Sequence, residues 1–449
     1  MTRAIERLAD LAAGWREASL SEALREAVQC ATLDWFATTL PGTLQPPATL
    51  LAASGLGRAA GNAWCYTGER RIDPRSAAFI NGSASHTVEF DDIFRDGGYH
   101  PGSPTFAAAL ALAQDLGASR EAFDRAVIGG YEVGCRIAMA LQPSHYRNWH
   151  ITGTVGTFGA ATAAAMLMGC QRDGIANAIA IAASFAGGVQ QNLQGESMVK
   201  AMHPGHAADA GILAAYAAAA GATGAWDSLD GPKGYAAATS DSTGNWDAAF
   251  DGAGEWTPIT RMTVKIHGCC GHIFPALDAL ETLRAEHGFG PEDIDAIRIE
   301  GYGPTKEICD RPDPQVAQEA RFSAQYCLAA QMVLGGVRLG AFTPEALTSA
   351  EIRALMPRIT VERAEDLAAE YPRRRMARLH VTLKDGRSWS HFQPSRRGDP
   401  DNPISRADLE AKFEELVAPV LNAPDLQRLR KTVFDGTDLP DAVTRRRNG

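Results

Sequence analysis

The sequence lacks the excess of positive charge that is typical of proteins that bind nucleic acid or anionic membranes. Its 449 residues include 43 Lys and Arg against 53 Asp and Glu, which gives a formal net charge of -10 at pH 7. A surface with this balance repels phosphate groups on average. The composition therefore argues against nucleic acid and anionic membranes as main partners, although a small anionic ligand can still bind in a locally positive pocket.

The sequence also lacks an apolar segment of the kind that exports a protein or anchors it in a bilayer. The first twenty residues contain Glu6, Asp10 and Glu17, and we expect them to form an amphipathic helix rather than a signal peptide. Two long runs without charge, residues 148–171 and 174–195, are rich in Ala, Gly and Thr but poor in Leu, Ile and Phe. This composition predicts closely packed, buried helices, so we expect a cytoplasmic protein with no membrane partner.

Paired cysteine motifs and nucleotide-binding glycine motifs are absent as well. The eight Cys residues show no CxxC spacing, and we expect free thiols, most of them buried. Gly153, Gly156 and Gly159 are spaced by three residues, which matches neither GxGxxG nor a Walker motif, and no strand precedes them. Nucleotide binding is therefore not expected. The glycine stripe instead predicts a close crossing of two helices.

The spacing of apolar residues predicts a mainly α-helical protein with a smaller α+β part. From the N-terminus to about residue 262 the pattern is helical, and no segment alternates convincingly as a strand. The pattern changes after that point. Short runs of β-branched residues, an alternating segment with a turn at Asp385-Gly386, and two helical segments follow. We expect strands at 293–301, 357–363 and within 377–392, and helices near 273–286 and 315–336.

The helical pattern resumes near Ser405, which has Asp408 at the spacing of a capping box. A helical C-terminal segment of this kind can rejoin the helical N-terminal part. We therefore predict a large all-helical domain formed by residues 1–262 and 398–449, with residues 263–397 inserted as an α+β lid.

An acidic stretch, "HTVEFDDIFRDGGYHP", begins at His86 and contains four carboxylates, Glu89, Asp91, Asp92 and Asp96. Carboxylates this close repel one another unless something pairs, protonates or binds them. On a helix, His86, Glu89 and Asp92 would lie on roughly one face. The residues alone leave open a metal site, a station for acid–base chemistry and a solvated loop.

Other side chains in the helical part invite similar alternatives. His150 precedes the glycine stripe, where it has either a structural partner or a cavity to face. Lys200 follows an uncharged segment, and a buried Lys needs a negative partner from the protein or from a ligand. His203 and His206 are candidate ligands, although capping and packing are the more common uses of such residues.

The segment that begins the α+β part, "TVKIHGCCGH", gathers Lys265, His267, Cys269, Cys270 and His272. Two His and two Cys in six residues suggest zinc, but adjacent Cys ligands are geometrically unfavourable, so no metal site is expected. Tyr326, on a predicted amphipathic helix, is most simply an aromatic residue at the edge of the core.

Taken together, these segments resemble the MmgE/PrpD family, which includes 2-methylcitrate dehydratase, cis-aconitate decarboxylase and iminodisuccinate epimerase. No single motif decides the resemblance, but six occur in the family's order between about residues 81 and 336. They are "NGSASHTVEFDD", "HPGSP", "GTVGTFGAA", "KAMHPGHAADAG", "KIHGCC" and "EARFSAQY". The resemblance implies an enzyme without cofactor or metal, a homodimer, that acts on a small di- or tricarboxylate.

The resemblance also implies roles for particular residues. The expected catalytic residues are Glu89, Asp91, Asp92, His100, His150, Lys200 and Tyr326. The expected substrate-binding residues are Lys200, His203, Lys265, Cys270 and His272. Two positions depart from the decarboxylase-like members, which have Thr where this chain has Ile93 and His where it has Cys270.

The reactions of the family share the formation or discharge of a carbanion next to a carboxylate. This step needs a base, an acid and cations that hold the carboxylates. His100 and His150 fit the proton transfers, and Lys200 and Lys265 fit the cations. We therefore expect a lyase, either a dehydratase or a decarboxylase. The alternatives are an epimerase of an iminodisuccinate-like acid, a metal-dependent hydrolase, and a carboxylate-binding protein without catalysis.

Overall fold

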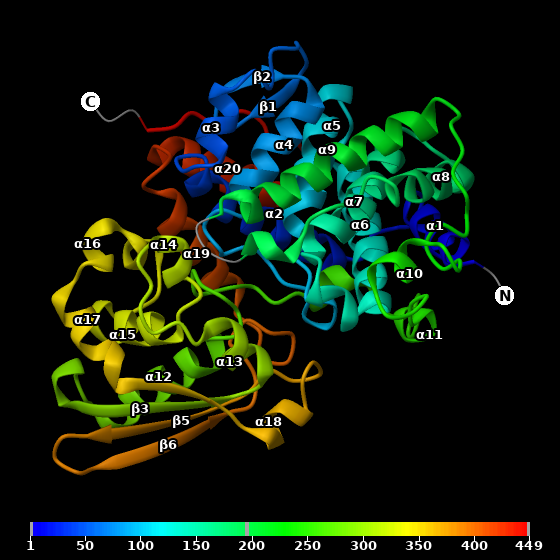
Figure 1. Ribbon diagram of the computed structural model, residues 1–449. Helices are drawn as coiled ribbons and strands as arrows, with labels where there is room; N and C mark the ends of the chain where they lie inside the picture. The colour runs from blue at the N-terminus through cyan, green and yellow to red at the C-terminus, as the bar shows by residue number, and fades with distance from the viewer. Residues whose placement is uncertain (1–2, 194–196, 447–449) are drawn as a thin grey trace. The chain divides into compact units, whose positions relative to one another are not determined.

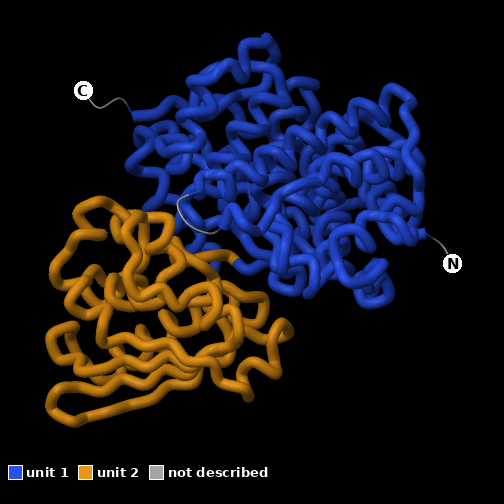
Figure 2. The backbone as a smooth tube through the Cα atoms, viewed as in Figure 1, with its two compact units in different colours: residues 1–263, 405–449 blue, residues 264–404 orange. Residues whose placement is uncertain are grey.

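The computed structural model describes residues 3–193 and 197–446. The chain divides into two compact units, which Figure 2 draws in blue and orange. The first unit comprises residues 1–263 and 405–449, and the second comprises residues 264–404. The mainly α-helical fold class is confirmed. The second unit is inserted in the sequence of the first, and its action as a lid stays a prediction.

The first unit consists almost entirely of helices (Figure 1). Its α-helices are α1 (Ala4–Trp15), α2 (Glu22–Gly42), α3 (Ala48–Ala53), α4 (Pro74–Ser85), α5 (Gly102–Leu116), α6 (Arg120–Leu141), α7 (Ile151–Leu167), α8 (Arg172–Ala182), α9 (Val199–Ala219), α10 (Tyr235–Thr239), α11 (Trp246–Ala249), α19 (Arg406–Val417) and α20 (Ala423–Asp435). Short 3-10 helices are η1 (Arg95–Gly97), η2 (Ser144–Arg147), η3 (Gln190–Leu193) and η4 (Pro258–Arg261).

Helix α7 runs through the core of this unit. Its residues from Ile151 to Met166 are all buried, and helices α5, α6, α8 and α9 pack against it (Figure 1). A Cβ atom added at Gly159 would lie 2.9 Å from the carbonyl oxygen of Gly130 on α6, which leaves no room for a side chain. The predicted close crossing is therefore confirmed. The tight packing also fixes the position of His150, which directly precedes α7.

The two uncharged runs fall mainly on α7 and α8 and on the segment after α8. Among the helices of residues 3–193 and 197–446, none combines the length and the apolar character needed to cross a membrane. The eight Cys residues are all free thiols, and seven of them are buried.

The prediction that the first unit is all-helical is wrong in one detail. Strands β1 (Ala63–Cys65) and β2 (Arg70–Ile72) form a small antiparallel hairpin. Asn81 on α4 holds it in place, because its Nδ2 donates to the carbonyl of Trp64 at 2.8 Å and its Oδ1 accepts from the amide of Tyr66 at 3.1 Å. Strands of three residues are too short to show an alternating pattern, so no periodicity predicts them.

The C-terminal segment contributes α19 and α20 to the first unit. Ser405 and Asp408 form the predicted capping box: the Ser405 hydroxyl accepts from the amide of Asp408 at 3.1 Å, and the Asp408 carboxylate accepts from the amide of Ser405 at 3.0 Å. Helix α19 packs against α2. It thereby carries Lys412 into the interior of the unit.

The second unit combines a sheet with helices. Its strands are β3 (Ile294–Gly301), β4 (Ile359–Arg363), β5 (Ala377–Leu383) and β6 (Ser388–Gln393), in the order β4-β3-β5-β6. Strand β3 pairs in parallel with β4 and antiparallel with β5, and β5 pairs antiparallel with β6. The predicted hairpin turn is confirmed, with Gly386 at φ +88°. Alternate residues of β5 are buried, which explains why its sequence alternates.

The helices of the second unit are α12 (Phe274–His287), α13 (Gly303–Cys309), α14 (Ala317–Ala320), α15 (Ala324–Leu334), α16 (Pro344–Leu347), α17 (Ala350–Leu355) and α18 (Glu365–Ala369), with short 3-10 helices η5 (Pro291–Asp293), η6 (Leu339–Phe342) and η7 (Met356–Arg358). The single helix predicted over 315–336 is wrong, because the segment divides into α14 and α15. Ser323 breaks it: its backbone is extended and its hydroxyl caps α15 by accepting from the amide of Tyr326 at 3.0 Å.

Candidate active site

The acidic stretch is a loop in the first unit. Helix α4 ends before His86, which is its C-cap residue. Glu89 then has φ +60°, in the left-handed region that residues other than glycine rarely adopt. The helical interpretation of His86, Glu89 and Asp92 is therefore wrong. The turn brings Asp91, and not Asp92, back toward His86.

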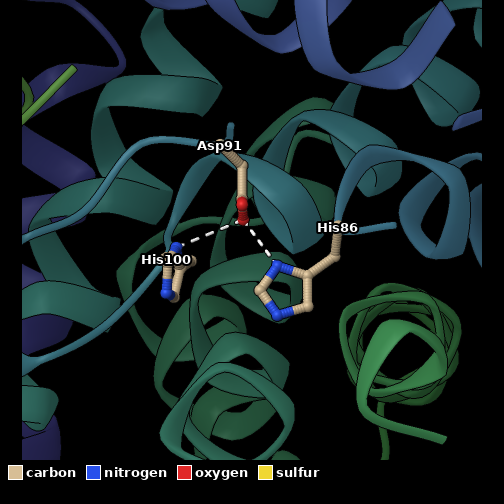
Figure 3. Close-up of side chains that lie close together, drawn as sticks. All are labelled: His86, Asp91 and His100. Carbon is tan, nitrogen blue, oxygen red and sulfur yellow. Dashed lines mark hydrogen bonds and ion pairs between the residues drawn. The ribbon is translucent and has the colours of Figure 1, made fainter. Parts of the chain in front are cut away.

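Asp91 lies between two histidines (Figure 3). Its Oδ2 atom accepts a hydrogen bond from Nδ1 of His86 at 2.6 Å and one from the hydroxyl of Ser103 at 2.9 Å. Nδ1 of His100 lies 3.2 Å from the same oxygen. Figure 3 shows the two imidazole rings on either side of the carboxylate. A negative charge on Asp91 therefore favours positive charge on the rings beside it.

Glu89 pairs with Lys200. Oε1 of Glu89 accepts a hydrogen bond from Nζ of Lys200, which lies in the first turn of α9, and both side chains are almost fully buried. The prediction that Lys200 is buried and has a negative partner is confirmed. Each charge keeps the other stable away from water, so the pair places a fixed ammonium group near the acidic loop.

Asp92 points away from the histidines. Its Oδ2 accepts from the hydroxyl of Tyr131 at 2.7 Å, and its Oδ1 accepts from the amide of Gly102 at 3.0 Å. Burial raises the pKa of Asp92 to about 7, and the nearby carboxylates of Asp34 and Asp91 act in the same direction. Asp92 is therefore partly protonated near neutral pH, unlike a carboxylate in water.

The four carboxylates of the loop thus avoid mutual repulsion in four different ways. Glu89 has an ammonium partner, Asp91 has imidazole partners, and Asp92 takes up a proton. Asp96 lies closer to the surface, with 43% of its side chain exposed and Arg95 beside it. Each solution is local, so the loop needs no shared ion to hold it together.

His150 lies opposite a fourth histidine, His203. Its Nδ1 atom is 2.8 Å from Nδ1 of His203 on α9, so one ring donates and the other accepts. The ring of His150 also stacks on that of His86, with centroids 5.5 Å apart. Burial lowers the pKa of His150 well below its ordinary value, and His86, Lys200 and His203 add to the effect. Burial, with help from His86 and Lys200, likewise lowers the pKa of His203 to about 4. Both rings are therefore neutral at neutral pH.

Lys412 of α19 also holds the acidic loop in place. Its Nζ donates to Oδ1 of Asp34 at 2.6 Å and to the carbonyl oxygen of Phe90 at 2.8 Å. Phe90 stands between Glu89 and Asp91, so this bond fixes the backbone that presents both carboxylates. No sequence motif pointed to Lys412 or Asp34, because they come from opposite ends of the chain.

Four of the predicted site residues lie in the second unit. Lys265 is 1% exposed and Cys270 is 8% exposed. Nδ1 of His272 lies 2.8 Å from the hydroxyl of Tyr302, and burial lowers the pKa of His272 well below its ordinary value. The substrate-binding roles of Lys265, Cys270 and His272 stay predictions.

Tyr326 is buried on α15. Its hydroxyl donates to the carbonyl oxygen of Ala341, and burial raises its pKa to about 12. Since a phenol has a single hydrogen to donate, this donor is occupied within the second unit. The proposed role of Tyr326 as a proton donor stays a prediction and would require that bond to break.

In the part of the chain that the structure describes, one group of side chains is close enough to hold a metal ion. Its ligand atoms, on His86, Asp91 and His100, all lie within 4.8 Å of one another (Figure 3). Two imidazoles and a carboxylate suit zinc or iron. However, His86 Nδ1 and Asp91 Oδ2 are 2.6 Å apart, whereas two ligands of a tetrahedral zinc ion at about 2.0–2.1 Å stand roughly 3.3 Å apart. The geometry is that of a hydrogen bond.

Comparison with known protein families identifies the chain. The model of the MmgE/PrpD N-terminal domain matches residues 6–246, and that of the MmgE/PrpD C-terminal domain matches residues 267–435. The chain belongs to the MmgE/PrpD family. The resemblance drawn from the six motifs is therefore confirmed.

Relatives within the MmgE/PrpD family are distant but match over most of their length. The chain is 28% identical to human cis-aconitate decarboxylase over 398 residues, which cover 83% of this chain and 78% of the human protein. It is 28% identical to the cis-aconitate decarboxylase-like protein oryM of Aspergillus oryzae, with 81% and 80% covered. It is 25% identical to cis-aconitate decarboxylase of Aspergillus terreus, with 83% and 80% covered.

Six of the predicted site residues lie close together in the first unit. They are Glu89, Asp91, His100, His150, Lys200 and His203. Two contributors were missed as site residues, His86 and Ser103, although both stand inside the quoted motifs. A signal existed in the sequence, because His86 begins the same acidic stretch. Its meaning depended on a turn at Glu89 that the sequence did not reveal.

Proposed function

We propose that the protein is a lyase that acts on a small di- or tricarboxylate by proton transfer at a carbon next to a carboxylate. The observation that carries the proposal is the unequal environment of His100 and His150. His100 has the Asp91 carboxylate beside its ring. His150 is buried next to the neutral ring of His203 and near the positive charge of Lys200. Pairs of titratable groups driven apart in this way are typical of acid–base catalysis.

The two environments suggest which histidine gives a proton and which takes one. Asp91 stabilises an imidazolium at His100, so His100 is assigned as the proton donor. His150 is neutral at neutral pH, so it is assigned as the acceptor. Its contact with His203 keeps Nδ1 engaged, and this leaves Nε2 as the atom for proton transfer.

Lys200 is assigned to a substrate carboxylate. An ammonium group has three N–H donors, and Glu89 accepts from one of them. A substrate carboxylate that binds to Lys200 is held beside the histidines. The positive charge of Lys200, which Glu89 holds in position, stabilises it. Lys265 is proposed as a second cation for a further carboxylate.

Within the lyases, decarboxylation of an acid of the cis-aconitate class is the first reaction to test, because the relatives carry that name. Two departures limit the analogy. Ile93 replaces a Thr, and Cys270 replaces a His, so one hydroxyl and one imidazole are missing. A dehydratase, or an epimerase of an iminodisuccinate-like acid, uses the same proton transfers and remains the alternative.

The test is incubation with a panel of acids related to cis-aconitate, citrate, malate and aspartate in deuterated water, followed by proton NMR. Loss of CO2 or of water supports the lyase. Exchange of a proton with inversion at carbon, and no elimination, supports the epimerase. If acids of the panel raise the melting temperature and none reacts, the protein is a binding protein and the proposal is wrong.

A metal-dependent hydrolase is a second candidate, favoured by the closeness of His86, Asp91 and His100. Elemental analysis of the purified protein tests it directly. About one zinc or iron per chain, together with activity lost to a chelator and restored by the metal, would support it. Full turnover in metal-free protein contradicts it.

A further inference from the structure

A surface cavity of the second unit lies between helices α12 and α15, which pack against each other (Figure 1). Its volume is about 250 Å³, and its walls include Leu280, Glu281 and Arg284 of α12 and Gln331 and Met332 of α15. The cavity thus combines two apolar side chains with a carboxylate, a guanidinium and an amide. The proposed reaction uses none of these residues.

The two charged residues of the cavity lie on the same face of α12, because residues three positions apart are neighbours on a helix surface. Nη1 of Arg284 donates to the carbonyl oxygen of Gln331 at 3.5 Å, a long contact that leaves most of its N–H groups available. Within residues 3–193 and 197–446, neither Glu281 nor Arg284 forms an ion pair. Both a positive and a negative group are therefore available to a ligand.

Gln331 supplies an acceptor that lacks a donor. The residue is 5% exposed, and its Nε2 donates to the carbonyl oxygen of Leu277 at 3.2 Å, which fixes the orientation of the amide. Its Oε1 is buried and has no hydrogen-bond partner in the part of the chain that the structure describes. A buried acceptor without a donor is unfavourable, so a ligand donor in the cavity would stabilise the folded protein.

The position of Gln331 on its helix indicates the charge of that donor. Gln331 lies in the last turn of α15, which ends at the C-cap residue Gly335. Carbonyl groups at the C-terminal end of a helix favour positive charge. The acceptor and the helix end together favour a ligand with a cationic N–H donor, such as an ammonium group.

We propose that this cavity binds a small α-amino acid. The ammonium group of the ligand donates to Oε1 of Gln331 and to Glu281, its carboxylate accepts from Arg284, and its carbon chain lies against Leu280 and Met332. A ligand with a single charge satisfies only one of the two charged residues. The inference does not rest on the proposed function, since an α-amino acid is a different ligand class from the di- and tricarboxylates named above.

Ligand-observed NMR titration of the full-length protein with three probes tests this charge pattern. L-leucine carries both charges, 4-methylpentanoate lacks the ammonium group, and 3-methylbutylamine lacks the carboxylate. We expect leucine to bind with a Kd of about 1 mM or lower. Each of the other two probes should bind at least about tenfold more weakly, because each loses one charge-assisted contact.

Substitutions of the two charged residues should separate the probes. Arg284→Gln should weaken the binding of leucine at least about fivefold but not that of 3-methylbutylamine, which has no carboxylate. Glu281→Gln should weaken the binding of leucine but not that of 4-methylpentanoate, which has no ammonium group. Glu286→Gln is the matched control, because Glu286 also lies on α12 but does not line the cavity. It should leave all three affinities unchanged.

The absence of detectable leucine binding at millimolar concentrations would overturn the proposal. Equal affinities for leucine and 4-methylpentanoate would do so as well. If Arg284→Gln and Glu281→Gln both bind leucine as wild type does, the amino acid binds elsewhere and the proposal is wrong. Glu281 is exposed and Arg284 is half-buried, so we expect both variants to fold, and circular dichroism checks this. Because no probe is a di- or tricarboxylate, failure of the proposed function leaves this test unaffected.

Discussion

The histidine cluster of the first unit has two sides, which place the imidazole side chain in opposite electrostatic environments. On the carboxylate side, His86 and His100 flank the anion of Asp91. On the imidazole side, His150 and His203 face each other without a counter-charge. Burial and nearby positive charge lower the pKa of His150 and His203, whereas the Asp91 carboxylate favours a positive charge on a ring beside it. The comparison teaches that burial keeps an imidazole neutral, and that a carboxylate beside the ring opposes this effect.

The largest expected effect comes from removal of one histidine on each side. We expect His100→Ala and His150→Ala each to lower kcat by at least about 10²-fold, the usual scale for the loss of a general acid or base. Steady-state kinetics on the identified substrate measure this. Circular dichroism and the melting temperature must show that each variant is folded. Activity of the wild-type level in either variant would remove that histidine from the proposed mechanism.

The second effect separates two adjacent carboxylates. Asp91→Asn removes the anion beside His100 and should lower kcat by about 10-fold or more, because an imidazolium there loses its counter-charge. Asp92→Asn should change kcat by less than about threefold, because Asp92 binds Tyr131 and Gly102 instead of a histidine. Equal losses in the two variants would contradict the assignment of Asp91 alone to the carboxylate side.

The third effect concerns the dependence of stability on pH, and it comes from Asp92, the sequence neighbour of Asp91. The pKa of Asp92 is raised to about 7 in the folded protein, whereas in an unfolded chain it is about 3.9. The folded state therefore holds a proton that the unfolded state has lost, and stability from this group falls as pH rises from about 4 to about 7. Asp92→Asn cannot lose a proton. As pH rises from 4.5 to 7.5, the melting temperature of Asp92→Asn should therefore increase by a few degrees relative to that of wild type. A constant difference between the two proteins would show that Asp92 is ionised in both states.

The smallest effect is the mirror image on the imidazole side. The pKa of His203 is lowered to about 4 in the folded protein and is about 6.5 unfolded. As pH falls below 6.5 the unfolded chain takes up a proton that the folded protein refuses, so stability is lost between about pH 6.5 and 4. His203→Gln should lose less stability than wild type in that window. Thermal melts at pH 7.5, 6.0 and 4.5 measure it, and an identical acid-side loss in both proteins would contradict the assignment.

Much of the fold followed from local signals in the sequence. Strand β5 alternates because alternate residues face the core, the turn before β6 carries Asp385-Gly386, and α19 begins with a capping box. Signals of this kind act within a few residues and are readable without the rest of the chain. The short hairpin of β1 and β2 and the break at Ser323 depend on single tertiary or capping contacts, and these were missed.

The site was predictable in composition but not in pairing. The motifs named Glu89, Asp91, His100 and Lys200, and the structure brings these side chains together in the first unit. They did not show that Glu89 takes a left-handed backbone conformation, and this turn decides which of the two adjacent aspartates meets the histidines. A choice of that kind rests on one dihedral angle and on distant residues, and periodicity carries no information about either.

The bonds from Lys412 to Asp34 and to the backbone of Phe90 have a consequence for biosynthesis. The ribosome synthesises every histidine of the cluster long before it reaches residue 412. The whole second unit is synthesised in between. A nascent chain of residues 1–263 thus carries the reactive side chains with a buried aspartate that still awaits its ammonium partner. The full set of contacts that holds the acidic loop can therefore form only after residue 412 has been synthesised.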